Sequence, residues 1–449
     1  MALTTQEKIA HLYRRVGFGA SQAELTAAME RGLDATLDML LNPEKVEDDV
    51  DLKLAQVNPP LDLSKERDLQ VWWLFRMLHT RRPLVEKMTL FWHNHFATAN
   101  YKVNDAGLML QQNNLFRQNA LGNFRLMVLN VSRDPAMLIW LDGNLNKKGN
   151  PNENFARELM ELFTTGRVDA VTGQPNYTEK DVDEVARAFT GWQFLRDRTT
   201  GATTFYRNDN EHDNGTKTAL GRTGNLDGTD VIDILIPHPA TARRVASELF
   251  MYFVHDNPTP AQIDALAKVY LDSKYEIRPV VRAILTSPEF FSEKAYLAKV
   301  KSPAEYVIGT LKQISPNATN LSALPEEMAR MGQELFNPPT VFGWDGGMEW
   351  INSTTMLARM NFARAISEGR GSGGINPSAI LSQNRLTTPA QIVDYFAQAL
   401  GPLPFSADVR ADLAGYITQT TGNSSADSMD TKVRGVIHLI LGTAEYQLA

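Results

Sequence analysis

The feature that most restricts the fold of this chain is a helix-start signal that recurs along its whole length. At each start a short side chain carries an oxygen atom, and in several cases proline follows it at the first helical position. The oxygen can accept from the unpaired N–H groups of the first turn, and proline has no N–H to leave unpaired. We therefore predict a mainly α protein, a multi-helix globular array. The starts are Ser21 with Glu24, Asn150-Pro151 with Glu153, Thr178 with Asp181, Thr259-Pro260, Ser302-Pro303 and Thr388-Pro389.

Signals for β-strands are sparse and gather in one stretch. Gln193-Phe194 and Thr203 to Tyr206 flank the turn-forming Thr199-Thr200-Gly201, which predicts a short β-hairpin near 193–206. The polar stretch 208–229 follows, and we expect a long loop there. Loops of that length inside a domain are uncommon and usually functional or disordered.

The 449 residues are enough for two or three domains. We expect a helical core over residues 1–370, with a sub-boundary near 230, and a C-terminal helical segment over 371–449. The glycine-rich stretch Gly369 to Gly374 would connect the two.

Two short sequences of the region 259–291 have counterparts near the C-terminus. Thr259 to Ile263 is repeated as Thr388 to Ile392, and Ile284 to Phe290 resembles Ile440 to Tyr446. Either a helix-hairpin unit occurs twice, or a good capping sequence has been reused. Both explanations remain open.

Composition excludes several classes of function. The chain has no cysteine, which removes disulfides, thiolate metal sites, iron–sulfur clusters and cysteine nucleophiles. Its net charge of −7, without a long basic run, argues against nucleic-acid binding. No stretch approaches the ~20 apolar residues of a membrane span, and Met1 to Lys8 lacks the pattern of a signal peptide. We find no nucleotide or haem signature, whereas a divalent metal stays open.

The stretch from Leu84 to His95 is predicted to be a helix, and two histidines lie at its C-terminal end. His95 continues its apolar stripe, and His93 lies about 200° away because each helical residue turns about 100°. Both can face one point only if the helix ends or bends near Asn94. The alternative is a hydrogen-bonded core histidine at 95 and a surface histidine at 93.

The stretch 150–166 predicts a helix with a second, polar stripe. Its apolar face consists of Phe155, Leu159, Leu162 and Phe163, and its polar stripe of Asn154, Arg157, Glu158, Glu161 and Thr165. Glu158 and Glu161 stand one turn apart, so partial burial would separate their pKa values, as general acid–base chemistry requires. The alternative is a solvated face with an Arg157–Glu161 ion pair.

The segment from Asp209 to Gly215 concentrates acidic groups around a histidine. It is not an EF-hand calcium loop, because Asn214 and Leu220 stand where that loop needs glycine and glutamate. Lys217 follows and could serve an anionic ligand or keep the loop soluble.

Several segments together carry a resemblance to one known family. They are His11 to Gly19, Phe91 to Phe96, Ala120 to Phe124, Arg133 to Met137, Asn152 to Phe163, Ala188 to Trp192, His212-Asp213, His238 to Thr241, Leu285 to Phe290, Val341 to Trp344 and Trp350 to Asn352. From about residue 7 to 365 the chain resembles the bacterial domain-of-unknown-function family numbered 1800. The resemblance implies a largely helical fold and no established activity. It also implies frequent export, from which the missing signal peptide departs.

These segments are rich in polar groups that a hydrophobic core does not require. We therefore expect a genuine polar site, in which the helix Asn154–Glu161 faces the histidine segment and loop 208–222 closes over it. The polar and tryptophan residues inside the segments are His93, His95, Asp134, Asp142, Asn154, Glu158, Glu161, Trp192, His212, Asp213, Trp344 and Asn352.

The first functional hypothesis is a hydrolase or lyase acting on a polymeric, carbohydrate-like substrate. Glu158 or Glu161 would be the acid or base, with Asp142 or Asp213 as partner, and His93 or His212 would move protons or orient the substrate. The substrate-binding candidates are Asn154, Trp192, Lys217, Trp344, Trp350 and Asn352.

Two other hypotheses stay open. One is a zinc, manganese or iron site built from His93, His95, Glu158, Glu161, His212 or Asp213. The other is a non-catalytic binding or assembly protein whose polar cluster is a structural network. The sequence leaves the oligomeric state undetermined.

Overall fold

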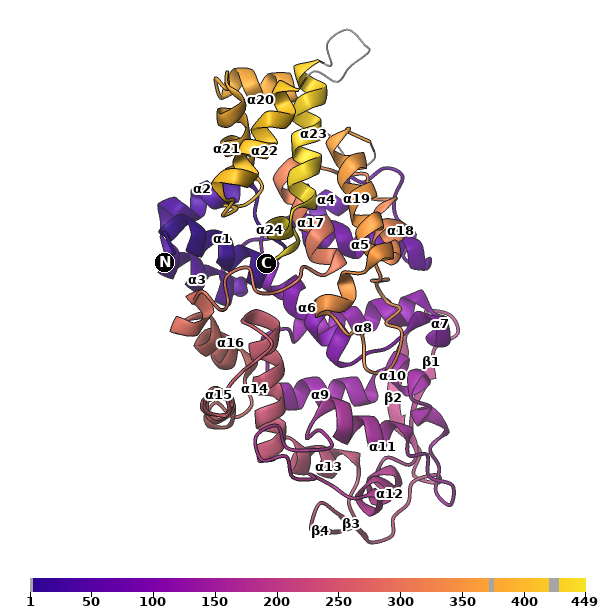
Figure 1. Cartoon of the computed structure of the whole chain (residues 1–449). Helices are drawn as coiled ribbons and strands as arrows, with labels where there is room; N and C mark the ends of the chain where they lie inside the picture. The colour runs from indigo at the N-terminus through magenta and orange to yellow at the C-terminus, as the bar shows by residue number, and fades with distance from the viewer. Residues whose placement is uncertain (1–2, 371–374, 420–427) are drawn as a thin grey trace.

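Helices carry nearly all of the regular structure in the computed structural model, which describes residues 3–370, 375–419 and 428–449 (Figure 1). The predicted caps are present: Ser21 and Thr178 each form a reciprocal capping box with the residue three positions on. The helix predicted from Asn150 begins later, at Asn154, because Asn150 turns back to pair with Lys147 in an isolated β-bridge.

The N-terminal third surrounds one interior helix, α6. Its elements are α1 (Thr5–Val16), α2 (Gln22–Arg31), α3 (Leu33–Leu41), η1 (Pro43–Lys45), α4 (Val50–Leu54), α5 (Glu66–His79), α6 (Pro83–His95), α7 (Asn100–Val103) and α8 (Ala106–Gln118).

The middle third contains both small sheets and the long helix α14. Its elements are α9 (Phe124–Arg133), α10 (Pro135–Trp140), η2 (Gly143–Leu145), α11 (Asn154–Glu158), η3 (Leu159–Phe163), α12 (Glu179–Ala188), β1 (Trp192–Arg196), β2 (Thr203–Arg207), β3 (Lys217–Ala219), β4 (Arg222–Gly224), α13 (Gly228–Leu235), α14 (Pro239–Phe253), α15 (Pro260–Asp272), α16 (Ile277–Leu285) and η4 (Pro288–Phe291).

The C-terminal third is helical, and in Figure 1 its helices α20 to α23 gather at the end of the molecule opposite the sheets. Its elements are α17 (Pro303–Ile314), α18 (Leu324–Arg330), η5 (Gly347–Trp350), α19 (Ser353–Ser367), α20 (Pro377–Gln383), α21 (Pro389–Ala399), α22 (Ala407–Thr418), α23 (Met429–Gly442) and α24 (Ala444–Gln447).

The predicted hairpin is confirmed: β1 and β2 pair antiparallel, with Trp192 opposite Arg207. The polar segment 208–229 is present as well, and it contains structure of its own, since β3 and β4 form a second antiparallel pair. That pair packs against α12.

The interior position of α6 decides where the site can form. Most of its residues are buried on every side, which is typical of a helix surrounded by protein rather than of one with a solvent face. Trp92 is fully buried, and its indole Nε1 donates to the carbonyl of Ala120 at 2.9 Å. Both faces of α6 therefore meet other elements.

The two related regions near the C-terminus share their helix starts. Thr259 and Thr388 each cap a helix with proline at the first position and a reciprocal glutamine. In the earlier region α15 is followed directly by α16, whereas α22 stands between α21 and α23. Duplication stays a prediction, as does a boundary near 370; residues 371–374 of the expected connection lie outside the described residues.

Candidate functional site

A cleft of about 560 Å³ opens where α6, α14, the end of η3 and the loop before η5 meet. It reaches the surface at Phe342 and Asp345, which are both exposed. Its lining includes Arg15, Asn94, His95, Leu162, Arg244, Glu248, Asp256, Lys299, Glu305, Phe342, Trp344, Asp345 and Trp350.

His95 stands at the inner wall of this cleft. Its Nδ1 lies 2.7 Å from Oε2 of Glu248, and its Nε2 lies 3.1 Å from the carbonyl oxygen of Phe163. A carboxylate and a carbonyl both accept hydrogen bonds, so with Glu248 ionised both contacts require an imidazole that carries two protons. Each ring nitrogen of His95 thus faces one acceptor oxygen.

Glu248 is itself placed by its own helix. Arg244 precedes it by one turn of α14, and the two side chains form an ion pair at 2.8 Å. Burial opposes ionisation of the Glu248 carboxyl, but His95 and Arg244 together outweigh it and lower the pKa of Glu248. A carboxylate, an imidazole and a guanidinium are thus joined in the cleft wall.

The third wall comes from η3, a single π-helical turn that follows α11 without a break. The last carbonyl groups of a helix have no partner within the helix and accept from elsewhere. Here Leu162 O accepts from Arg244 Nε at 3.1 Å, and Phe163 O faces His95. The histidine segment therefore meets the C-terminal end of the predicted helix 150–166, through the carbonyl of Phe163. Turns of this π type are frequent at functional sites.

Asn94 fixes the loop that carries the aromatic rim. Its side chain accepts from the backbone N–H of Trp344 at 2.7 Å and lies 3.4 Å from the Trp344 carbonyl. The neighbouring Gly343 has a φ of 82°, and a Cβ added there would lie 2.3 Å from Asn94 Oδ1. Only glycine allows this close approach without strain.

Aromatic side chains form the outer wall. Phe342 is 64% exposed, whereas Trp344 and Trp350 are buried, with exposed fractions of 6% and 7%. Trp344 and Trp350, two of the three tryptophans predicted to bind substrate, line the cleft. The largest open aromatic surface of the cleft is that of Phe342, which sequence reasoning missed.

His93 points to the other side of α6, as the helical geometry predicts. The helix runs unbroken to His95, and the His93 ring lies among Trp73, Phe336 and Trp344. Burial alone lowers the pKa of His93 to about 3. The alternative of a surface histidine at 93 is wrong, and that of a hydrogen-bonded core histidine at 95 is confirmed.

The predicted glutamate stripe lies outside the cleft. Burial, and then the charge of Glu161, raise the pKa of Glu158, and Glu161 accepts from the hydroxyl of Tyr177 at 3.2 Å. Arg157 pairs with Glu153 and Glu179 instead of Glu161.

One other contact joins two predicted residues. Asn154 Nδ2 lies 3.3 Å from an Asp142 oxygen, and Asp142 also pairs with Lys102 at 3.0 Å.

Loop 208–222 does not close over the histidine segment; it packs on α12 because its polar groups find partners there. His212 Nδ1 lies 2.9 Å from the Thr190 carbonyl. Asp213 pairs with Arg187 at 2.8 Å, and this contact lowers the pKa of Asp213 to about 2. Lys217 is buried and donates to Gly215 O at 3.1 Å.

Two further predicted residues have visible structural roles. Trp192 is buried and packs edge-on against Phe189 and Phe205. Asn352 caps α19 by accepting from the backbone N–H groups of Thr354 and Thr355. Neither lines the cleft.

Sequence reasoning missed the charged residues that complete the cleft: Arg15, Arg244, Glu248, Asp256, Lys299 and Glu305. The spacing of Arg244 and Glu248 on α14 was a visible signal for an ion pair. No local pattern could assign Glu248 to His95, because 153 residues separate them.

A metal site was one of the hypotheses drawn from the sequence. Within the described residues, no three or more histidine, aspartate or glutamate side chains are arranged to hold a metal ion. Across the same ranges, no helix is long and apolar enough to cross a lipid bilayer.

Comparison with known protein families found one matching family. The family described as Protein of unknown function (DUF1800) matches residues 11–448, nearly the whole sequence. The chain belongs to this family. The match includes the C-terminal helices, so the family extends beyond the stretch that ends near residue 365 in the resemblance drawn from individual segments. Neither a search of curated proteins nor a search of solved structures found a match.

Proposed function

We propose that the protein is a hydrolase or lyase that holds a polymeric, carbohydrate-like substrate in the cleft between α6 and α14. One observation carries the proposal. Five segments of the family resemblance, far apart in sequence, contribute to the lining of this one cleft: His11 to Gly19, Phe91 to Phe96, Asn152 to Phe163, Val341 to Trp344 and Trp350 to Asn352.

The proposed proton donor is His95. Glu248 Oε2 lies 2.7 Å from Nδ1 of His95, and in the proposal it accepts the Nδ1 proton and so fixes the orientation of the ring. The Nε2 proton then becomes available when its contact with the Phe163 carbonyl is exchanged for a substrate oxygen. An imidazolium positioned by a carboxylate is an effective general acid near neutral pH.

The proposed base is Asp345, which is exposed in the same lining. In hydrolysis it would take a proton from the attacking water, and in a lyase reaction from the carbon beside the bond that breaks. Phe342 would pack on the flat face of a sugar ring, because it offers the largest open aromatic surface of the cleft.

The test is a screen of soluble polysaccharides with the purified chain. Released reducing ends report hydrolysis, and ultraviolet absorbance of unsaturated ends reports a lyase. On any substrate found, His95→Gln and Glu248→Gln should each lower turnover on the order of 100-fold or more while the fold stays intact.

The matched control is Glu326→Gln, which removes an exposed carboxylate from a one-turn arginine pair on α18. It should keep full turnover. Undiminished turnover in both His95→Gln and Glu248→Gln would contradict the proposal. Binding without turnover on every polymer tested would favour a non-catalytic binding protein.

A further inference from the structure

Arg15, on α1, is a buried cation of the cleft without an acidic partner. Its side chain lines the cleft, and the residue is 2% exposed. One terminal nitrogen, Nη2, donates to the carbonyl of Ala295 at 2.6 Å. Nε is buried and has no hydrogen-bond partner within the described residues. Arg15 belongs to the His11 to Gly19 segment, and the proposed function gives it no role.

The carboxylates near Arg15 are already engaged. Glu305 pairs with Lys87 and accepts from the backbone N–H of Ser302 at 2.7 Å. Asp256 pairs with Lys299. These two acids raise the pKa of Arg15, but burial outweighs them and lowers it to about 9.

The remaining charges of the lining are matched in the same way. Arg244 pairs with Glu248, so Asp345, exposed at the mouth, is the one further carboxylate of the lining. Arg15 is thus the cation of the cleft that has only a carbonyl as partner. Burying an unpaired charge costs several kcal/mol, so such a group is expected to gain a partner when the site is filled.

We propose that the substrate of this cleft is an acidic carbohydrate, whose carboxylate pairs with the guanidinium of Arg15. The planar guanidinium presents its N–H groups as a fork that matches a carboxylate, and burial strengthens the contact. The inference rests on the proposed function, since it names the substrate class of the same cleft. A sulfate ester has related chemistry and is separated from a carboxylate by the test.

The experiment measures binding to the full chain by calorimetry with three probes. Oligogalacturonate carries carboxylates, its methyl ester has the same backbone without the charges, and a sulfated dextran oligosaccharide carries sulfate esters. We expect oligogalacturonate to bind, and its methyl ester to bind about 30-fold more weakly or worse, as for other buried charge pairs. Tighter binding of the sulfated probe than of oligogalacturonate would overturn the carboxylate assignment.

Variants connect the binding to Arg15. Arg15→Gln should weaken oligogalacturonate binding about 30-fold and leave binding of the methyl ester unchanged. Arg15→Lys keeps the positive charge but lacks the forked N–H groups, so its affinity for oligogalacturonate should lie between those of the unaltered chain and Arg15→Gln. This variant keeps the test usable if Arg15→Gln fails to fold. Arg330→Gln, a change at an exposed arginine of α18, should bind as the unaltered chain does.

The two proposals fail in different ways. If the methyl ester binds as tightly as the acid and Phe342→Ala weakens both, the cleft takes carbohydrate and the acidic substrate is wrong. If no probe binds, the acidic substrate is wrong, and turnover of a neutral polysaccharide decides the proposed function. If oligogalacturonate binds but Arg15→Gln has no effect, the role of Arg15 is overturned.

Discussion

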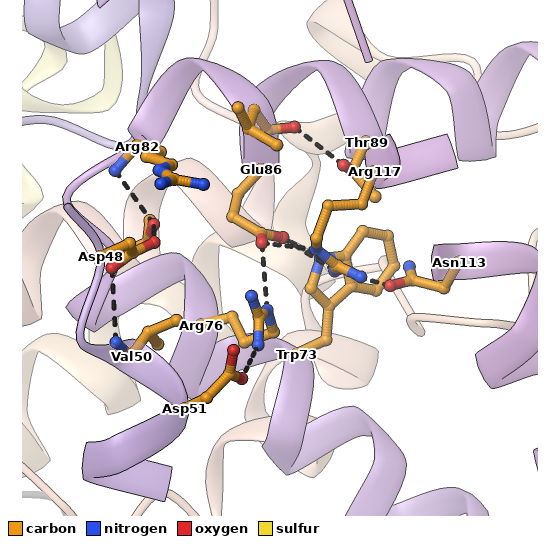
Figure 2. A network of polar contacts seen from close by, with 12 residues as sticks. Asp48, Val50, Asp51, Trp73, Arg76, Arg82, Glu86, Thr89, Asn113 and Arg117 are labelled. Carbon is orange, nitrogen blue, oxygen red and sulfur yellow. Dashed lines mark hydrogen bonds and ion pairs between the residues drawn. The ribbon is translucent and has the colours of Figure 1, made fainter. Parts of the chain in front are cut away.

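Each face of α6 has a glutamate beside an arginine, the buried Glu86 of α6 itself on one face and the half-buried Glu248 of α14 on the other, yet the two glutamates are bonded very differently. On one face Glu86 receives four hydrogen bonds: one from Trp73 Nε1, one from Arg76 Nε and two from Arg117 (Figure 2). On the other face His95 meets Glu248, which is shared between an imidazole and one arginine.

Under the proposed function, the difference separates a carboxylate that stabilises the fold from one that positions a proton donor. All four contacts of Glu86 come from groups that keep their protons at neutral pH. Burial opposes ionisation of Glu86, but Arg117 and Arg76 outweigh it and lower the pKa of Glu86. Glu248 instead holds the one side-chain type that exchanges protons near neutral pH. A buried carboxylate saturated by arginine and tryptophan fixes the fold, whereas one bonded to histidine can take part in proton transfer.

The largest effect expected from this comparison is on stability at Glu86. Glu86→Ala leaves Arg76 and Arg117 buried without their shared partner and should cost about 3–5 kcal/mol of unfolding free energy. Urea unfolding followed by circular dichroism measures it. A loss below that of Glu248→Gln would reverse the roles given to the two glutamates.

Glu248→Gln should be milder for the fold. It keeps the shape of the side chain and loses charge-assisted bonds to His95 and Arg244, for an expected cost of about 1.5–3 kcal/mol. The same urea experiment applies. A cost equal to that of Glu86→Ala would show that the cleft pair is structural.

Gly343→Ala tests whether the loop at the rim of the cleft is held rigidly by Asn94. The added methyl group meets Asn94 and the positive φ adds strain, so we expect a loss of about 1–3 kcal/mol. Binding in the cleft should fall with it, because Trp344 and Phe342 lie on the same loop. Unchanged stability and binding would show that the loop adapts.

The last prediction is a pH dependence of stability at His93, which has no effect at neutral pH and develops only as the pH falls below 6.5. Burial lowers the pKa of His93 to about 3, so the unfolded chain binds the proton more readily between its usual value near 6.5 and 3. The stability contributed by the neutral His93 is complete above pH 6.5 and is lost as the pH falls toward 3. The slope of the unfolding free energy against pH counts the protons that the chain takes up when it unfolds. In His93→Phe that number should fall by up to one, as measured by urea unfolding across this range. An identical dependence in the variant would contradict the assignment.

The parts of this molecule that sequence predicts well depend on neighbouring residues. The caps at Ser21 and Thr178 and the β1–β2 hairpin follow from bonds that span a few residues. The opposite directions of His93 and His95 followed from helical geometry alone.

The cleft itself depends on distant contacts and on one irregular turn. The π turn of η3 places the Phe163 carbonyl against His95, and a regular helical period does not predict it. Arg15 reaches the Ala295 carbonyl across 280 residues. Prediction from sequence therefore located the histidine segment and assigned its chemistry to Glu158 and Glu161, which face elsewhere.

The most direct test of the central claim sets the cleft against the glutamate stripe. Turnover on an identified polysaccharide is measured for the double variant His95→Gln/Glu248→Gln and for Glu158→Gln/Glu161→Gln, each checked for folding by circular dichroism. We predict that turnover is lost in the first and kept in the second. Loss in the second with full turnover in the first would contradict the account and move the working site to the stripe.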